Sequence, residues 1–360
     1  MPDPARICGY DVLGRVAVGG MGTVYAAVRR GPGGFAKRVA IKQLHANLQL
    51  AEEARSRFAG EARLAARLQH PNIVDVFGFE TDGETYNIVM EYVHGCNLSA
   101  LLKTYGRPTP ALALLIVSKV LYALEAVHGQ ADWPGEPDTV VHRDISPKNI
   151  LLSDEGEVKI TDFGLALIVS EGTGGSGLRG TPGYMSPEQA NADRIDPRSD
   201  LYSLGLVLYE MLAGRRAYPG ENKLAVLRRS QEALASDLSM EEVPADLQPL
   251  LRRALARDPK DRYSDAAAFR HEVDRCLERR GRPPRETLSS VVRPLTPRFS
   301  ASPPAPQPDE ILGPEPLDLV EQAPTISFAQ SRSRLIAALV LALVAATLLI
   351  WMVLAVNTRY

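Results

Sequence analysis

Cysteine is scarce in this sequence, and no strong charge of either sign is present. Cys8, Cys96 and Cys276 form neither a CxxC pair nor a disulfide ladder, which favours free thiols in a reducing cytoplasm over a redox role. The six histidines show no metal-ligand spacing. Lys and Arg together number 41 and Asp and Glu number 43, so the net charge of -2 gives no reason to expect nucleic acid as a partner.

The N-terminus also lacks the apolar stretch of a signal peptide, since it reads Met-Pro-Asp-Pro-Ala-Arg. We therefore expect that the globular part is not exported by cleavage. The 360 residues are 45% hydrophobic and 23% charged, which is an ordinary globular composition. This length suffices for two domains or for one bilobal domain.

Long apolar runs are absent except at residues 335–356, which carry no charge. About 20 apolar residues suffice to cross a bilayer as a helix, so this run predicts a transmembrane helix, with a buried core helix as the alternative. Arg332 and Arg334 precede the run and only Arg359 follows it. The positive-inside rule therefore favours residues 1–334 on the cytoplasmic side of a membrane.

The most informative stretch is residues 140–152, Val-Val-His-Arg-Asp-Ile-Ser-Pro-Lys-Asn-Ile-Leu-Leu, followed shortly by Ile-Thr-Asp-Phe-Gly. Apolar residues on both sides of a polar, proline-containing turn predict two short buried strands that hold a loop. The loop displays Asp144, Lys148 and Asn149, and the next strand delivers Asp162. Two carboxylates, an amide and an ammonium at one place suit metal-bound phosphate chemistry, which needs hard oxygen ligands, a base and a cation.

This spacing of His-Arg-Asp, Asn149 and Asp-Phe-Gly resembles the catalytic core of the eukaryotic-type (Hanks-type) serine/threonine protein kinases, of the bacterial membrane-anchored kind. The resemblance implies an α+β, bilobal protein-kinase fold, with a small β-rich N-lobe that carries one key helix and a larger helical C-lobe. It implies ATP and Mg2+ (or Mn2+) as cofactors and proteins with Ser or Thr hydroxyls as substrates. It further implies signalling at a membrane, autophosphorylation and, for that reaction, a homodimer.

Residues 10–28 alternate apolar and polar around a glycine-rich turn, which predicts strand, turn and strand. Gly19, Gly22 and Val24 match the glycine-rich loop of the resembled family, but Ala17 stands at its first glycine and stiffens the cover over the phosphates. A plain hairpin turn would give the same pattern. By resemblance, the nucleotide contacts Val16, Ala17, Val18, Gly19, Gly20, Met21, Gly22, Thr23, Val24, Ala40, Lys42, Glu91 and Val93.

Lys42 ends an alternating strand, and Glu61 lies on the inward side of a helix predicted over 51–68. In the resembled family such a glutamate holds the strand lysine against the α- and β-phosphates, and these two residues take those places. Strands are also predicted at 75–79 and 86–92, and the second leads to the crossing between the lobes. There, by resemblance, backbone groups of Glu91 and Val93 hold adenine, and Met90 controls the pocket behind.

Residues 98–128 predict two amphipathic helices, followed by a proline-rich surface loop without an assigned role. Residues 165–180 are rich in glycine and serine, which predicts a mobile segment. It ends in Gly-Thr-Pro-Gly-Tyr-Met-Ser-Pro-Glu-Gln at 180–189. This block resembles the substrate-docking end of the activation segment of serine/threonine kinases, with Thr181 as the docking residue. Small-molecule kinases lack it, and tyrosine kinases carry a different one.

The apolar run 200–212 is too short to cross a membrane and predicts the buried central helix of the larger lobe. By resemblance, Asp200 caps that helix and braces the catalytic loop, while Arg262 pairs with Glu188. Proline recurs beyond the recognised domain, which predicts disorder. The expected domains are a kinase domain at 9–278 (N-lobe about 9–92, C-lobe about 96–278), a disordered juxtamembrane linker at 279–333, the transmembrane helix at 335–356 and a short tail at 357–360.

The resemblance also assigns roles in a reaction. Lys42 and Glu61 position ATP, Asn149 and Asp162 hold magnesium, and Asp144 orients the substrate hydroxyl and accepts its proton. Ser146 stands where the family usually has lysine, and the hypothesis is that Lys148 or another base partly substitutes for that lysine.

Single residues also suggest how the activity is regulated and which other functions are possible. Arg143 beside the catalytic aspartate predicts regulation by a phosphate on the activation segment, with Thr173 and Ser176 as candidate sites. Two other functions stay open at this stage. One is a catalytically dead pseudokinase scaffold tethered to the membrane, which Ala17 and Ser146 would suit, and the other is a small-molecule phosphotransferase.

Overall fold

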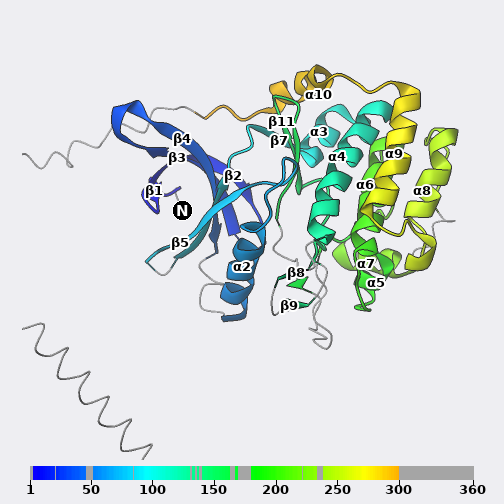
Figure 1. The fold of residues 1–360 in the computed structure, drawn as a ribbon, viewed down its shortest axis with the longest axis horizontal. Helices are drawn as coiled ribbons and strands as arrows, with labels where there is room; N and C mark the ends of the chain where they lie inside the picture. Colours follow the sequence, from blue (N-terminus) through cyan, green and yellow to red (C-terminus); the bar gives the residue numbers. More distant parts are fainter. Residues whose placement is uncertain are drawn as a thin grey trace, which may run out of the picture. The chain divides into compact units, whose positions relative to one another are not determined.

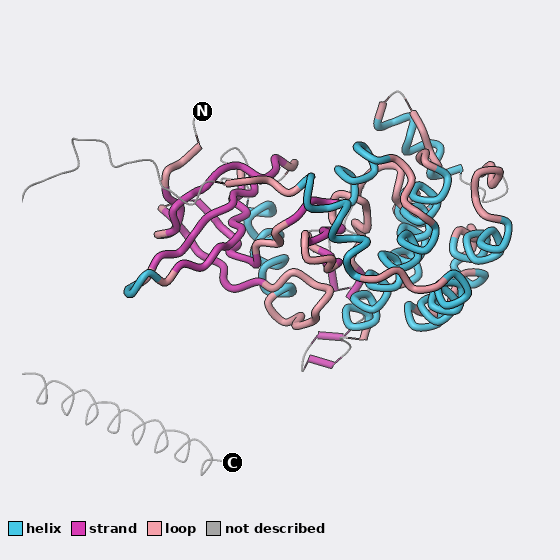
Figure 2. The backbone as a smooth tube through the Cα atoms, turned by 90° about the horizontal axis from the view of Figure 1, so that it is seen from above, coloured by secondary structure: helices cyan, strands magenta, loops and turns pink. Residues whose placement is uncertain are grey.

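The computed structural model describes residues 3–20, 22–45, 52–83, 85–129, 132–133, 136–137, 140–162, 167–168, 180–220, 222–232 and 238–299. Strands gather in one lobe and helices in another, as Figures 1 and 2 show. The predicted bilobal α+β arrangement is therefore confirmed.

The N-lobe is built on a six-stranded antiparallel sheet in the order β1-β2-β3-β4-β6-β5. Its strands are β1 Arg6–Ile7, β2 Tyr10–Val18, β3 Gly22–Arg30, β4 Ala36–Leu44, β5 Val76–Asp82 and β6 Thr85–Glu91. The predicted glycine-rich hairpin is the connection from β2 to β3, where the Gly19 amide donates to the Gly22 carbonyl at 2.8 Å. A Cβ on Gly22 would lie 2.3 Å from the Gln43 carbonyl oxygen of β4, so only glycine fits there.

Helix α2, Glu52–Ala65, packs on this sheet through Phe58 and Ala62, which form a small core with Leu44 and Ile88. The helix ends three residues before the predicted position. The Leu68 amide bonds to the Ala65 carbonyl in a tighter turn, and the chain then reaches the His70-Pro71 pair that ends helical structure.

The C-lobe holds most of the buried apolar side chains in one cluster. Its helices are α3 Leu98–Tyr105, α4 Pro110–His128, α5 Pro187–Ala190, α6 Arg198–Ala213, α7 Lys223–Glu232, α8 Gln248–Ala254 and α9 Ala266–Arg280, with short 3-10 turns at Ala245–Leu247 and Pro259–Asp261. Sequence signals fix several ends: the side chains of Asn97, Thr109 and Asp265 accept from backbone amides at the first turns of α3, α4 and α9.

The prediction of two helices over 98–128 is confirmed, but the amphipathic character of the second is wrong. Helix α4 is buried on nearly all sides, because α6, α9 and β12 all pack against it. Among the described residues it is also the helix long and apolar enough to cross a membrane, but two thirds of it is inside the lobe, which marks a core helix. Residues 335–356 lie outside the described part of the chain.

The predicted central helix over 200–212 is confirmed as α6 and is buried along almost its whole length. It ends at Gly214 in a left-handed conformation with φ 73°, as a helix C-terminal glycine commonly does. The loop after α4 forms a short hairpin of β8 Asp132–Trp133 and β9 Glu136–Pro137.

The predicted disorder of residues 279–333 is wrong for its first part. Helix α10, Arg285–Val292, and a 3-10 turn, Arg293–Leu295, follow α9 and belong to the folded unit. Leu288 and Val292 are fully buried in the core of the C-lobe. The prolines only flank this helix, so they do not prevent it, and apolar side chains at helical spacing dock it. The rest of the predicted linker, from residue 300, lies outside the described residues.

Candidate active site

Two short strands, β10 Val140–Val141 and β11 Ile150–Ser153, hold the loop that carries the candidate catalytic residues, and each pairs with other strands. β11 pairs with β12 Val158–Ile160 on one side and with β7 Gly95–Asn97 on the other, while β10 pairs with β13 Leu167–Ile168. The predicted pair of buried strands around the loop is thus confirmed. Residues 142–149 form the loop between β10 and β11.

Asp200 of α6 braces the start of this loop. Its carboxylate accepts from the His142 and Arg143 amides at 2.8 Å each, and it lies 2.9 Å from His128 Nε2. Burial would raise the pKa of Asp200, but the bond to His128 and the nearby imidazoles outweigh burial and lower it. These bonds hold Arg143 in a left-handed conformation with φ 66°. The bracing role is confirmed, but the capping role is wrong: Pro197 is the N-cap of α6, and the amide of Arg198, the first residue of the helix, donates to Asp196 and not to Asp200.

Asp144 lies at the centre of a hydrogen-bond set that joins two distant segments. Its Oδ1 accepts from the Thr181 amide at 2.8 Å and from the Thr181 hydroxyl at 2.6 Å. The Asn149 side-chain amide donates to Asp144 Oδ2 and to the Asp144 carbonyl, both at 2.9 Å. Burial raises the pKa of Asp144, and the bonds from Thr181 and Asn149 only partly oppose this. The carboxylate is therefore fixed in orientation and more basic than an exposed aspartate.

Lys42 of β4 reaches across the site to Asp162. Its side chain is buried, with 8% of the residue exposed, and its Nζ lies 2.8 Å from Asp162 Oδ1. Burial would raise the pKa of Asp162, but the Lys42 ammonium outweighs it and holds the pKa below its usual range. Glu61 lies on α2, but its side chain is outside the described part, so the pair predicted between Lys42 and Glu61 stays a prediction.

The donor set of Asn149 and Asp162 fits a divalent cation. Because the Asn149 nitrogen donates to Asp144, its carbonyl oxygen is left as an acceptor. Asp162 presents a carboxylate held ionised by Lys42, and amide and carboxylate oxygens are ligands that Mg2+ prefers. Neither here nor elsewhere among the described residues do three or more His, Cys, Asp or Glu side chains form a group that could hold a metal.

The predicted nucleotide-binding residues lie on the β2–β3 hairpin, on β4, and at and just after the end of β6. Val16 and Val18 at the end of β2 are exposed by 44% and 62%, as expected of apolar side chains over a ligand pocket. Ala40, Val74 and Met90 form a buried cluster that Val24, Tyr92 and Val93 pack against. This cluster forms an apolar surface at the place where the sequence predicts the adenine ring, beside Glu91 and Val93. Met21 lies outside the described residues.

Glu91 and Met90 also have contacts that the sequence did not indicate. The Glu91 carboxylate pairs with Lys159 Nζ at 2.9 Å, so this side chain joins the crossing between the lobes to β12. Met90 lines a cavity of only about 10 Å³ with Lys42, Val74 and Asp162, so the space behind it is nearly closed.

Ser146, which stands where the family usually has lysine, and Lys148, its suggested substitute, differ in their exposure to solvent. Ser146 is fully buried, and its hydroxyl has no hydrogen-bond partner among the described residues. Lys148 is exposed between the buried Pro147 and Asn149. The hypothesis that Lys148 supplies the missing cation stays a hypothesis.

The activation-segment end, 180–189, is anchored from both sides. Arg262 makes a bidentate pair with Glu188 at 2.7 and 2.8 Å, as predicted. Burial would raise the pKa of Glu188, but the Arg262 guanidinium outweighs burial and lowers it. Ser186 caps α5 in a capping box with Gln189, whose side chain also donates to the Arg143 carbonyl at 2.9 Å. Thr173 and Ser176 lie outside the described residues.

The sequence did not indicate the direct bond from Thr181 to Asp144, since its motif pointed only to a role for Thr181 in substrate docking. His128 and Gln189 were also missed as supports of the catalytic loop. A signal existed for Gln189, since serine followed three residues later by glutamine marks a helix start. No local pattern points to His128, which lies 72 residues from its partner Asp200.

Comparison with known proteins agrees with this geometry. The family model described as "Protein kinase domain" matches residues 10–273. A protein named Tyrosine-protein kinase MasK from Myxococcus xanthus is 37% identical over 276 residues, which are 74% of this chain and 43% of that protein. A Probable serine/threonine-protein kinase, CPE1738, from Clostridium perfringens is 36% identical over 285 residues, 78% of this chain and 39% of that protein.

A third relative, Serine/threonine-protein kinase PknL from Mycobacterium bovis, is 35% identical over 275 residues, which are 75% of this chain and 66% of that protein. The chain thus spans about two fifths of the length of the first two relatives. The first of these relatives is named as a tyrosine kinase, and the other two are named as serine/threonine kinases.

Proposed function

Because the chain belongs to the protein kinase family, we propose that it transfers the γ-phosphoryl group of ATP to Ser and Thr hydroxyls of proteins. Two relatives named as serine/threonine kinases support this choice, and the relative named as a tyrosine kinase makes the acceptor residue the point to test. Asp144, Asn149, Asp162 and Lys42 carry the reaction in this proposal.

The observation that carries the proposal is the position of Asp144 between Thr181 and Asn149. Asn149 fixes one carboxylate oxygen, and Thr181 ties the other to the segment where a protein substrate would dock. Asp144 then orients the incoming hydroxyl and takes its proton as the hydroxyl oxygen bonds to the γ-phosphorus, while the bond from that phosphorus to the β-phosphate oxygen breaks and ADP leaves. Burial raises the pKa of Asp144, which suits a base. A serine or threonine hydroxyl is short, so a docking segment bonded directly to the base suits it.

The remaining residues place the nucleotide. The β2–β3 turn lies over the phosphates, and Lys42 contacts them from the buried side. A divalent cation held by Asn149 and Asp162 would supply charge neutralisation for the phosphoryl group. Asp162 stays ionised because Lys42 lies beside it, so the site is ready for a cation at neutral pH.

The test is phosphotransfer by the purified chain to casein and to a tyrosine-containing acidic polymer, with Mg2+ and labelled ATP, followed by phosphoamino-acid analysis. We expect phosphoserine and phosphothreonine from the native chain, and a loss of at least about 100-fold in Asp144→Asn, because a general base contributes that much or more. Label on tyrosine alone would overturn the proposed acceptor. Equal, background labelling by both proteins would favour the pseudokinase scaffold.

We also propose that the kinase acts on itself and at a membrane. Mass spectrometry of the same reaction should find phosphate on Thr173 or Ser176, and Thr173→Ala with Ser176→Ala should lower activity if that phosphate binds near Arg143. The apolar run 335–356, with Arg332 and Arg334 before it, supports an anchor that leaves the kinase domain in the cytoplasm. A homodimer would allow one copy to phosphorylate another.

A further inference from the structure

The segment after α9 crosses from the helical lobe to the β-sheet lobe. We call residues 281–299 the C-terminal strap; it contains α10, the turn Arg293–Leu295 and the extended residues 296–299. Figure 1 shows it leaving α10 and running toward the sheet. The strap lies beyond the region that the family model matches, which ends at residue 273.

The first anchor of the strap is on the C-lobe, at the turn between β11 and β12. The Ser289 hydroxyl and Arg293 Nε both donate to the Asp154 carbonyl, and Arg285 pairs with Glu157 at 3.0 Å. A Cβ on Gly156, which has φ 84°, would lie 2.5 Å from the Arg285 carbonyl oxygen. With Leu288 and Val292 buried in the core, this part of the strap is fixed.

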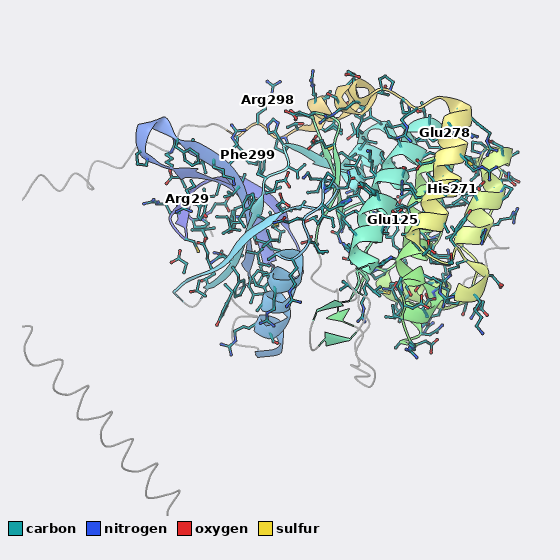
Figure 3. All side chains as sticks on the ribbon, viewed as in Figure 1. Arg29, Glu125, His271, Glu278, Arg298 and Phe299 are labelled. Atoms are coloured by element: carbon teal, nitrogen blue, oxygen red, sulfur yellow. The ribbon has the colours of Figure 1, made fainter. Side chains whose placement is uncertain are left out.

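The second anchor is on the N-lobe and consists of one aromatic side chain. The Phe299 ring packs edge-on against Tyr92, with centroids 6.3 Å apart and planes at 71°. It also fills the space above Gly14 of β2, where an added Cβ would lie 2.7 Å from Phe299 Cε1. Figure 3 shows Phe299 beside the strands of the sheet, at the end of the segment that comes from α10.

The two anchors lie on opposite sides of the crossing between the lobes. His94 of this crossing bonds to Asp154 through its ring at 2.8 Å and through its backbone carbonyl, so the first anchor is tied to it. A polar cavity of about 490 Å³ lies between the crossing and the strap, lined by Glu91, His94, Asp154 and Arg293 among others. The strap therefore spans this crossing on its outer side and holds the N-lobe from there.

The residues under Phe299 adjoin the proposed nucleotide site. Tyr92 packs on the cluster of Ala40, Val74 and Met90, and Gly14 lies on β2 just before Val16. β2 is irregular at this place, since its pairing with β3 shifts between Val12 and Gly14 and again between Arg15 and Ala17. A contact at Gly14 can therefore set the direction of the strand that carries the glycine-rich turn.

We propose that Phe299 is a positioning residue for the nucleotide: it fixes β2 against Tyr92 from outside and so sets how tightly the N-lobe closes over ATP. This inference rests on the proposed kinase function. It makes the C-terminal strap a part of the catalytic unit. Release of the strap would weaken nucleotide binding without removing any group that touches the phosphates.

The experiment measures ADP affinity by calorimetry and the KM for ATP and kcat, using the full chain in detergent micelles. Phe299→Ala should raise the Kd for ADP and the KM for ATP about threefold to tenfold, the factor that one lost aromatic pair gives, while kcat stays nearly constant. Arg298→Ala is the matched control, because this neighbour is exposed and points away from the sheet (Figure 3), and it should leave both values unchanged.

Gly14→Ala supplies a second, independent arm. Its new methyl should displace the Phe299 ring and raise the Kd for ADP in the native background, but have no further effect in Phe299→Ala. Additive effects of the two changes, or equal affinity of Phe299→Ala and Arg298→Ala, would overturn the proposal.

Amide hydrogen exchange without nucleotide separates this inference from the proposed function. Exchange in residues 91–94 and in β2 should quicken in Phe299→Ala and not in Arg298→Ala. If the native chain binds no ADP but this difference appears, the kinase proposal fails and the strap contact stands. If ADP binds and no exchange difference appears, the strap proposal fails.

Discussion

At the scale of single residues, the candidate catalytic side chains were predictable, but only some of the residues that support them were. Asp144, Asn149 and Asp162 could be found because the chemistry fixes both their types and their spacing. The bond from Thr181 to Asp144 joins residues 37 positions apart, and it depends on how the activation segment folds back. Ser146 differs again. The sequence shows that serine stands where the family usually has lysine, but it does not show that this serine is buried without a hydrogen-bond partner among the described residues.

The buried hydroxyl of Ser146 gives a prediction about stability and activity together. An unpaired buried polar group costs about 1–3 kcal/mol, so Ser146→Ala should keep or raise the melting temperature of the free chain. If the hydroxyl instead bonds to a group of the nucleotide or substrate, the same change should lower kcat. Thermal unfolding and phosphotransfer on one preparation measure both.

The matched control is Ser118→Ala on α4. The Ser118 hydroxyl is also buried, but it donates to Asp274 at 2.7 Å, so its loss should destabilise the chain by about 1 kcal/mol and leave kcat alone. A Ser146→Ala chain that loses stability like this control would show that its hydroxyl has a structural partner.

At the scale of elements, the sequence predicted the β2–β3 hairpin, α2 and α6, and failed at α10. Alternation around a glycine-rich turn identified the hairpin, helical spacing of apolar residues identified α2, and a run that is apolar nearly all round identified α6. Around α10 the recurrent prolines dominated the composition and predicted disorder. The apolar residues Leu288, Val291, Val292 and Leu295 nevertheless repeat at helical spacing, and a short helix needs only such a docking face.

The packing of α10 predicts the effect of Leu288→Ala. Removing this fully buried side chain should destabilise the chain by about 2–5 kcal/mol, measured by urea unfolding. Ser290→Ala on the exposed side of the same helix is the control and should change stability by less than about 0.5 kcal/mol. If the two variants are equally stable, α10 does not pack on the C-lobe, and residues 285–295 belong to the disordered linker that the sequence predicted.

The pair of Glu188 and Arg262 predicts a pH dependence of stability. The folded-state pKa of Glu188 lies below the ordinary value of 4.5, so its stabilisation is fully present above about pH 4.5 and is lost as pH falls through the lowered pKa. Glu188→Gln leaves the buried Arg262 unpaired, which should cost about 3–5 kcal/mol at pH 7. The difference in the free energy of unfolding between Glu188→Gln and the native chain, measured by urea unfolding at each pH, should become smaller in acid.

The control for that prediction is Glu272→Gln, which breaks a pair with Arg275 on the surface of α9. An exposed pair contributes about 0–1 kcal/mol, so this variant should follow the native chain at every pH. If the free energies of unfolding of Glu188→Gln and the native chain differ by the same amount from pH 7 down to pH 3, Glu188 is not the group whose protonation lowers the stability.

At the scale of the whole molecule, two segments of the chain are long and apolar. One is helix α4, which lies inside the C-lobe where other helices cover it. The other is residues 335–356, which carry no charge and have arginines on both sides. Composition alone could not separate them, because burial by neighbouring helices and burial by lipid select the same residue types. The described fold identifies α4 as a core helix, and the flanking arginines are the reason that a membrane anchor is proposed for residues 335–356.

The orientation of the predicted anchor can be measured with a cysteine placed in the short tail. In spheroplasts that express the full chain, Thr358→Cys should react with a membrane-impermeant maleimide, because the positive-inside rule leaves residues 357–360 outside. The native chain is the control: Cys8, Cys96 and Cys276 all lie in the kinase domain and should react only after the membrane is opened, and Cys276 slowly even then because it is buried. Labelling of Thr358→Cys only after lysis would place the tail and the kinase domain on the same side of the membrane, and the single-span arrangement would be wrong.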